Sequence, residues 1–341
     1  MAVVFSKGAY SGANEPLWKD IDRVLTLVMQ DTDNEKNNDD ELVKSIFNVK
    51  TSKRFGEKIG SMTEFANFDI VDEGNDYVLD DVQGGFTKLI EHSAMLKGFV
   101  CTREMKDDGQ IDTMKVAAAN FIRAYKRTRA QFASDALTTE GSTFTFGGKS
   151  SLDKTTGDGK GLFATDHPYS KSGLSGTQSN VFTNAFGTDS VMLNKLANIG
   201  RNFKNQSGNV MGYTFDTIII PGNCPELEDT VKKVIRTDLM VGSNYNDINT
   251  QKGLWKLIID HRWEAPVVSS AQTNPYILMS SEANRELQGA LFYDRCPLDV
   301  RNEVLNKSRN LEWSGYCRMG VGFGSWAPFI MGGAQVGSTI S

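Results

Sequence analysis

The longest regular pattern of apolar and polar positions lies between Asp112 and Leu137. Apolar side chains recur there at the spacing of an α-helix, and no Gly or Pro interrupts the run. The opposite side is basic, with Arg123, Lys126 and Arg127. At 1.5 Å per residue such a helix would be roughly 40 Å long, more than most globular domains need. We predict a long spine helix over 112–137 that buries one stripe, formed by Met114, Ala118, Phe121, Tyr125, Thr128 and Phe132.

The N-terminal region shows three different patterns. Residues 1–16 contain Gly8, Gly12 and Pro16 with little periodicity, which favours an extended arm. Residues 17–29 place apolar side chains at helical spacing and predict a short helix. The segment 31–41 has six acids and one lysine and is interpreted as a solvated linker.

An acidic segment follows, with seven acids and no Lys or Arg between Ile59 and Thr87. Two strand-like runs, 65–71 and 76–82, flank a Gly-Asn turn and predict a β-hairpin. A two-stranded hairpin alone is marginally stable in water, so it should lie against another surface. That surface belongs either to the same chain or to another subunit.

After the spine, residues 141–187 are rich in Gly, Ser, Thr and Asp and predict a long loop. Helical and strand patterns then alternate over 188–290, including a capping-box-like helix start at Asn223 and Glu226. This alternation predicts a compact α/β unit. The last fifty residues are typical of strands with many glycines.

Composition describes an ordinary globular protein, with 39% hydrophobic and 23% charged residues. The net charge of -5 argues against a dedicated nucleic-acid binder. No apolar run approaches the ~20 residues that span a bilayer, and no secretory signal is visible at the N-terminus. The four cysteines show no Cys-x-x-Cys spacing and are expected to be reduced.

Candidate chemistry is sparse. Asp166 and His167 adjoin, but neither a nucleophile nor further metal ligands stand at a recognisable spacing, so we expect a turn in which Asp166 bonds backbone N–H groups. The segment 218–228 lacks a phosphate-binding motif, and the acids beside Cys224 disfavour a thiolate there. We therefore expect no enzyme, no cofactor and no metal.

The order of these elements resembles the major capsid proteins of tailed bacteriophages, which have the Hong Kong 97-like fold. The resemblance rests on MKVAAANFIRAYKRTRAQFASDAL (114–137), FDTIIIPGNCPELEDTVKKVI (215–235), GLWKLIIDHRW (253–263) and SGYCRMGVGFGSWAPFIMGG (314–333). In addition, GLFATDHPY (161–169) is similar to a Leu-Phe-x-x-Asp-His stretch in Mu-type phage head proteins.

The resemblance implies an α+β chain with an N-terminal arm (1–40), the start of a peripheral domain (41–55) and an extended loop (56–90). The peripheral domain continues over 91–187, an axial domain covers 188–297, and closing strands of the peripheral domain cover 298–341. It also implies hexamers and pentamers that form an icosahedral head around double-stranded DNA, without sequence-specific binding. The implied partners are a portal protein and a separate scaffolding protein. The implied location is the virion, after assembly in the bacterial cytoplasm and with no membrane contact.

Charge then suggests how copies meet, because the hairpin is acidic and other surfaces are basic. We expect the hairpin of one copy to lie over basic residues of a neighbour, where exposed ion pairs would set register more than affinity. The expected contact residues on the hairpin are Asp69, Asp72, Glu73, Asn75 and Asp76. Opposite them we expect either the helix side, with Arg123, Lys126 and Arg127, or the C-terminal strands, with Arg301, Lys307 and Arg309. Two alternatives remain at this point: an encapsulin-like nanocompartment shell, and a soluble α/β enzyme using Asp166 and His167.

Overall fold

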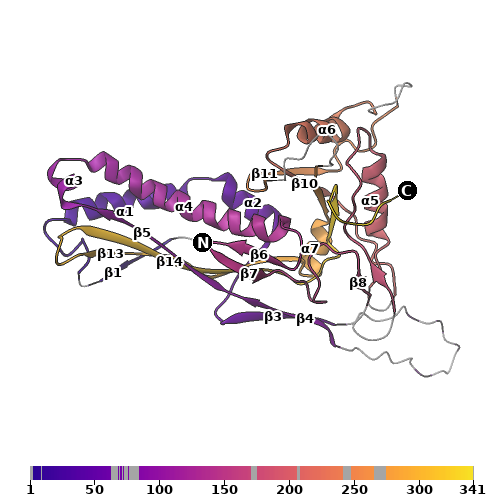
Figure 1. The fold of residues 1–341 in the computed structure, drawn as a ribbon, viewed down its shortest axis with the longest axis horizontal. Helices are drawn as coiled ribbons and strands as arrows, with labels where there is room; N and C mark the ends of the chain where they lie inside the picture. Colours follow the sequence, from indigo (N-terminus) through magenta and orange to yellow (C-terminus); the bar gives the residue numbers. More distant parts are fainter. Residues whose placement is uncertain are drawn as a thin grey trace. The chain divides into compact units, whose positions relative to one another are not determined.

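The computed structural model describes residues 3–8, 10–62, 68, 70, 72, 76, 84–169, 175–205, 208–240, 247–264 and 274–340. The chain forms two compact units, each made of three separate stretches. Unit 1 comprises 1–57, 91–133 and 292–321, and unit 2 comprises 58–90, 134–291 and 322–341. Figure 1 labels the helices and strands of both.

Unit 1 is a mixed sheet with the spine helix along one side (Figure 1). The strand order is β1–β13–β14–β5, and β2 also pairs with β13. The first strand runs parallel to β13, whereas β5 is antiparallel to β14. The elements are β1 (Val4–Lys7), α1 (Lys19–Asn34), α2 (Asn38–Ile46), β2 (Asn48–Thr51), β5 (Ser93–Cys101), α3 (Arg103–Asp107), α4 (Ile111–Thr138), β13 (Ala290–Val304) and β14 (Leu311–Phe323).

The predicted spine helix is confirmed as α4, which extends one residue further at each end than the predicted 112–137. Four of the six residues of its predicted apolar stripe are buried, and Tyr125 and Thr128 are half-buried. The helix packs closely on the sheet, because the ring of Phe121 lies 5.3 Å from that of Phe99. A Cβ added at Gly315 would lie 2.6 Å from Phe121, so this approach requires glycine.

The predicted linker over 31–41 is wrong. Helix α1 continues to Asn34 and α2 begins at Asn38, so only three residues separate them. Acidic residues in a first turn are favourable because they face the positive end of the helix dipole, and α2 has three there. The side chain of Asn37 also accepts a hydrogen bond from the Asp39 N–H at 3.0 Å and caps α2. The same acids that suggested solvation therefore start a helix.

Unit 2 contains a four-stranded sheet in the order β11–β10–β12–β15, in which only the β10–β11 pair is parallel. Its central strands β10 and β12 are buried along their whole length. The elements are β3 (Gly56–Met62), β4 (Gly84–Glu91), β6 (Thr143–Phe146), β7 (Lys149–Asp153), β8 (His167–Pro168), β9 (Thr177–Gln178), α5 (Val191–Arg201), β10 (Thr217–Pro221), α6 (Pro225–Arg236), β11 (Lys256–Asp260), β12 (Tyr276–Met279), α7 (Ser281–Glu286) and β15 (Phe329–Gly332).

The division between the units differs from the expected peripheral and axial domains. Residues 141–187 and 322–341 were assigned to the peripheral domain, but they belong to unit 2 together with the α/β sheet. The reason is strand pairing over a long sequence distance, since β15 is antiparallel to β12 and pairs Gly332 with Tyr276. The capping box at Asn223 is also wrong, because α6 begins at Pro225 and its N-cap is Cys224, with no side-chain cap bond.

Among the described residues, none of the helices combines the length and the apolar character needed to cross a membrane. The four cysteines are free, with Cys101 and Cys317 buried.

Candidate functional site

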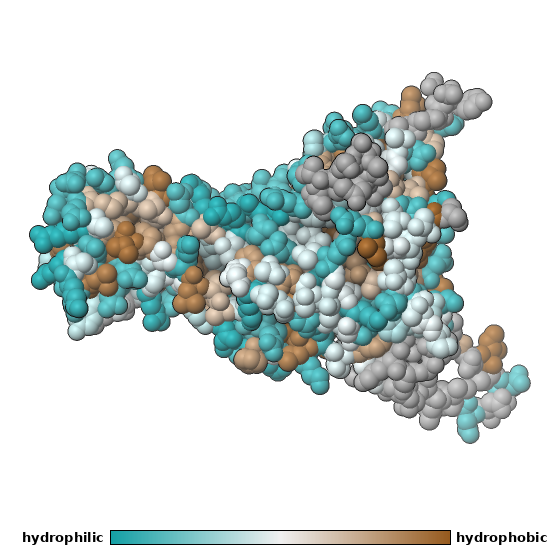
Figure 2. All heavy atoms as spheres, in the orientation of Figure 1, coloured by the Kyte–Doolittle hydropathy of each residue, from teal (hydrophilic) through white to brown (hydrophobic). Residues whose placement is uncertain are grey.

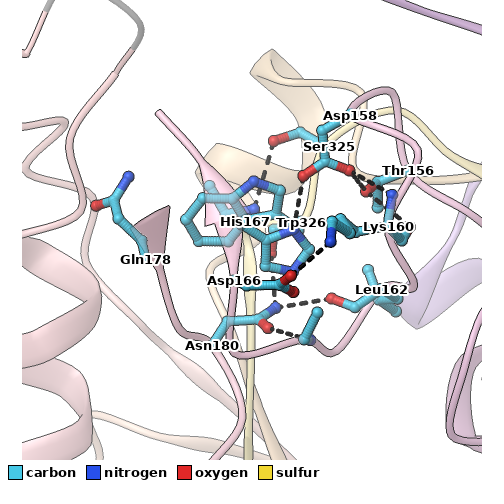
Figure 3. Close-up of polar contacts among 12 residues, drawn as sticks. Thr156, Asp158, Lys160, Leu162, Asp166, His167, Gln178, Asn180, Ser325 and Trp326 are labelled. Carbon is cyan, nitrogen blue, oxygen red and sulfur yellow. Dashed lines mark hydrogen bonds and ion pairs between the residues drawn. The ribbon is translucent and has the colours of Figure 1, made fainter. Parts of the chain in front are cut away.

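The Asp166-His167 pair belongs to a packed centre of unit 2, shown in Figure 3. His167 is fully buried in β8, and its Nδ1 lies 2.7 Å from Oδ2 of Asp158. Its ring stacks on Trp326, with centroids 4.5 Å apart. Asp158 is held in turn by the hydroxyl of Thr156 and by the Lys160 N–H. These contacts join the loop before β8 to the C-terminal segment.

The electrostatics of this centre favour an ionised Asp158. Burial by itself would raise the pKa of this carboxyl group, but hydrogen bonds from His167 and Thr156 lower it below the ordinary value of 3.8. Asp158 therefore acts as a buried acceptor that fixes the imidazole ring.

The centre does not have the geometry of a catalytic site. Nε2 of His167 is buried, and no hydrogen-bond partner lies near it among the described residues, so no nucleophile is positioned on it. Asp166 is exposed and pairs with Lys160 at 2.5 Å. The predicted turn is wrong: His167 and Pro168 form a short strand paired with Gln178 and Thr177.

Asn180 is a second polar anchor of this region, and the sequence analysis did not identify it. Its side chain is fully buried, donates to the carbonyl oxygens of Leu162 and Phe329, and accepts from the Ala164 N–H at 3.0 Å (Figure 3 shows the contact with Leu162). An asparagine in a loop carries no sequence signal for such a role. Its position beside a strand 150 residues later is known only from the fold.

Other chemistry is not supported in the described part of the chain. No group of three His, Cys, Asp or Glu side chains that could hold a metal occurs there. Burial raises the pKa of the Cys224 thiol, which disfavours the thiolate that a nucleophile needs.

The basic side of the spine helix is less available than its sequence suggests. Lys126 is only 3% exposed and donates to three carbonyl oxygens at the end of α1, those of Thr32, Asp33 and Glu35, at 2.8–3.1 Å. It closes the C-terminus of α1 and is not free for a neighbouring subunit. Arg123 and Arg127 are exposed, and Arg123 lies 3.7 Å from Glu35.

Figure 2, drawn in the orientation of Figure 1, shows the surface of unit 1 around α1, α3 and α4 on the left. It is mainly hydrophilic, with hydrophobic side chains scattered singly. Isolated apolar side chains of this kind are normal on a protein surface. A subunit contact on this face would therefore be polar.

The basic residues of the C-terminal strands are exposed. Arg301 donates to Asp299 at 3.2 Å, and Arg309 to Glu15 at 3.4 Å. Lys307 lies between the strands, in the turn after β13. The structure places them in unit 1, as it does Arg123 and Arg127.

Of the predicted acidic contact residues, Asp69, Glu73 and Asn75 lie outside the described residues. Asp72 and Asp76 are exposed. Two apolar residues of the same segment, Phe68 and Ile70, are 105% and 103% exposed. Large apolar side chains in full contact with water favour association with another surface.

The face of the unit 1 sheet that points away from α4 presents a second basic surface, which the sequence analysis did not identify. Alternating burial along β14 places Arg318 on this face. In β13, Asp294 pairs with Arg129 of α4, so the next residue, Arg295, points to the opposite face of the sheet, where it donates to the carbonyl oxygen of Arg54 at 3.1 Å. Within the described residues none of Arg54, Arg295 and Arg318 forms an ion pair. Beside them lies an apolar pair, Leu96 opposite Tyr316. We call these three arginines and the apolar pair the open sheet face.

Comparison with known proteins shows which fold the chain has. No family model matches the chain, and no curated protein does. A structure of Mycobacterium phage Patience matches 98% of this chain and 92% of its own, with a TM-score of 0.52 and 10% identity. The capsid of a native GTA (gene transfer agent) particle matches over 88% and 91%, with a TM-score of 0.54 and 10% identity. A structure of Gordonia phage Cozz matches over 88% and 86%, with a TM-score of 0.52 and 10% identity.

The chain has the Hong Kong 97-like capsid fold. The fold class expected from the sequence is thereby confirmed. The matches do not confirm the narrower resemblance to Mu-type head proteins.

Proposed function

We propose that this protein is the major capsid protein of a tailed phage or a related particle, and that its role is structural, without catalysis. The observation that carries the proposal is the fold, since the chain matches structures from phages and a gene transfer agent capsid over most of its length.

Copies of the chain are the main partners in this proposal. Rings of five and six would close into an icosahedral head, with a portal protein at one vertex and a separate scaffolding protein during assembly. Double-stranded DNA would be enclosed without sequence-specific contacts, inside a virion assembled in the bacterial cytoplasm. Many weak contacts per subunit would add up through multivalency.

Within the shell, the acidic segment of one copy would lie on the open sheet face of its neighbour. Asp72 and Asp76 match the unpaired Arg54, Arg295 and Arg318 in charge, and Phe68 and Ile70 match Leu96 and Tyr316 in polarity. Arg301, Lys307 and Arg309 extend the basic surface of the same unit. The helix-side alternative has less support, because Lys126 is buried and Arg123 already faces Glu35.

The mass of the purified particle tests the proposal. Light scattering after size exclusion, with a negative-stain image of the same fraction, should show megadalton particles, rings or tubes. A chain that stays monomeric even when its scaffolding protein is coexpressed would contradict the proposal. Nucleic acid inside the particles would separate a phage head from a nanocompartment shell, which would instead hold a protein cargo.

A further inference from the structure

The two-stranded sheet β3–β4, whose strands lie on either side of the acidic segment in the sequence, contacts the chain at the end of β7. In β4, the alternate residues Phe86, Lys88 and Ile90 form one face. A Cβ added at Gly157 would meet Phe86 at 3.1 Å, and one added at Gly322 would meet Ile90 at 2.5 Å. Glycine at both positions thus allows β4 to lie directly on this part of unit 2, and Lys88 is the charged residue in the middle of an otherwise apolar contact.

Lys88 attaches this face to the end of β7. Its side chain is 7% exposed, and its ammonium group donates to the carboxylate of Asp153 and to the hydroxyl of Thr155. Asp153 is held ready for this contact, because its other oxygen accepts from the N–H and the hydroxyl of Thr155 at 2.9 and 2.8 Å. Burial is the largest single influence and would raise the pKa of Asp153, but the hydrogen bonds from Lys88 and Thr155 together outweigh it and the pKa is lowered. Asp153 is therefore ionised at neutral pH.

The next residue, Lys154, points to a different partner. Its side chain is 1% exposed, and its ammonium group donates to the carbonyl oxygen of Thr139, directly after α4 ends. Burial lowers the pKa of Lys154 to about 7, partly offset by Glu140. A helix C-terminus leaves carbonyl oxygens without partners, so this contact fixes the last turn. Hydrogen bonds from buried charged groups are among the costly ones to lose.

The last residue of β7, Asp153, and the residue that follows it, Lys154, thus hold two elements that are far apart in sequence. We propose that Asp153 and Lys154 couple the two-stranded sheet β3–β4 to the last turn of the spine helix, so that loosening one loosens the other. A neighbouring molecule that moved this sheet would then change the order of the helix end, and the reverse. This coupling is a property of the single chain and does not depend on whether the chain forms a shell.

Amide hydrogen exchange on the unassembled chain tests the coupling, at a protein concentration where no particles form. We expect Lys88→Met to speed exchange at least fivefold both at 84–90 and, across the joint, at 134–140. Lys154→Met should have the same two effects. The matched control is Lys160→Met, which removes an exposed lysine of the same loop whose partner is Asp166, and it should change neither segment.

Two outcomes would overturn the proposal. In one, Lys88→Met changes only 84–90 and Lys154→Met changes only 134–140, which would make the contacts independent. The second concerns the double variant Lys88→Asp with Asp153→Lys, in which the two charges are swapped. The proposal is overturned if this variant has slow amide exchange at 84–90, as in wild type, but still has fast amide exchange at 134–140. Circular dichroism of each variant establishes that it is folded before exchange is measured. Particles that form normally without the coupling would leave the proposed function intact and reject only this inference.

Discussion

At the scale of single residues, the polar side chains that organise this protein are buried ones. His167 through its stacking on Trp326, and Asn180 and Lys126 through hydrogen bonds, each join segments far apart in the sequence. Lys and Asn are mostly exposed in proteins and His is intermediate, so residue type alone does not identify these three as buried. Burial becomes favourable only because the fold supplies their hydrogen-bond partners, which no local pattern encodes.

Asp158 should make the free energy of unfolding depend on pH in the acidic range. Its pKa is lowered in the folded protein, so its contribution is present above the unfolded value near 3.8 and is lost as pH falls through the lowered folded value. We expect Asp158→Asn to lower the free energy of unfolding by about 1–3 kcal/mol at pH 7, by breaking a charged hydrogen bond. The difference from wild type should shrink below about pH 3. Urea unfolding curves at several pH values measure this, and a constant difference down to pH 2 would contradict it.

At the scale of helices and strands, the periodicity of apolar residues predicted the elements that depend only on their own sequence. The spine helix was predictable to within one residue at each end, because 26 residues without Gly or Pro repeat one apolar stripe. The segment 31–41 was mispredicted because acidity alone does not distinguish a solvated linker from two capped helix ends. The cap of α1 comes from Lys126, more than 90 residues later, and a sequence pattern cannot show that.

Removal of this cap should loosen α1. We expect Lys126→Met to lower the free energy of unfolding by roughly 2–4 kcal/mol, because three carbonyl oxygens at the end of α1 lose a buried donor. The matched control is Arg123→Met on the same helix, whose exposed ion pair with Glu35 should contribute less than about 1 kcal/mol. Denaturant unfolding measures both variants. Equal losses would show that Lys126 does not act as a cap.

At the scale of the whole molecule, the order of elements was sufficient to predict the fold class, although the division of the chain between its units was not predictable. The order of helices and strands can be read directly along the sequence. The pairing of β15 with β12 joins residues about fifty positions apart, and the sequence offers many strands of similar character. For the same reason the open sheet face was missed, because Arg54, Arg295 and Arg318 are brought together only by the sheet.

Charge reversal on this face should weaken assembly. We expect Arg54→Glu with Arg295→Glu to raise the protein concentration needed for particles about tenfold, and Asp72→Lys with Asp76→Lys to restore it in mixed assembly. The effect should fade at 1 M salt, where charges are screened beyond about 3 Å. The matched control is Arg123→Glu with Arg127→Glu on the helix side. If only the control weakens assembly, the acidic segment docks on the helix side and the proposed contact is wrong.

The three-part construction of each unit also has a consequence for synthesis on the ribosome. The spine helix leaves the ribosome long before β13 and β14, the strands it covers. At about 5–20 residues per second, the delay is on the order of ten to forty seconds. During that time the apolar stripe of α4 has no sheet to cover, and neither unit can close. Nascent chains of this protein should therefore be clients of chaperones that bind apolar helices, and shell subunits become competent only after their last strands are made.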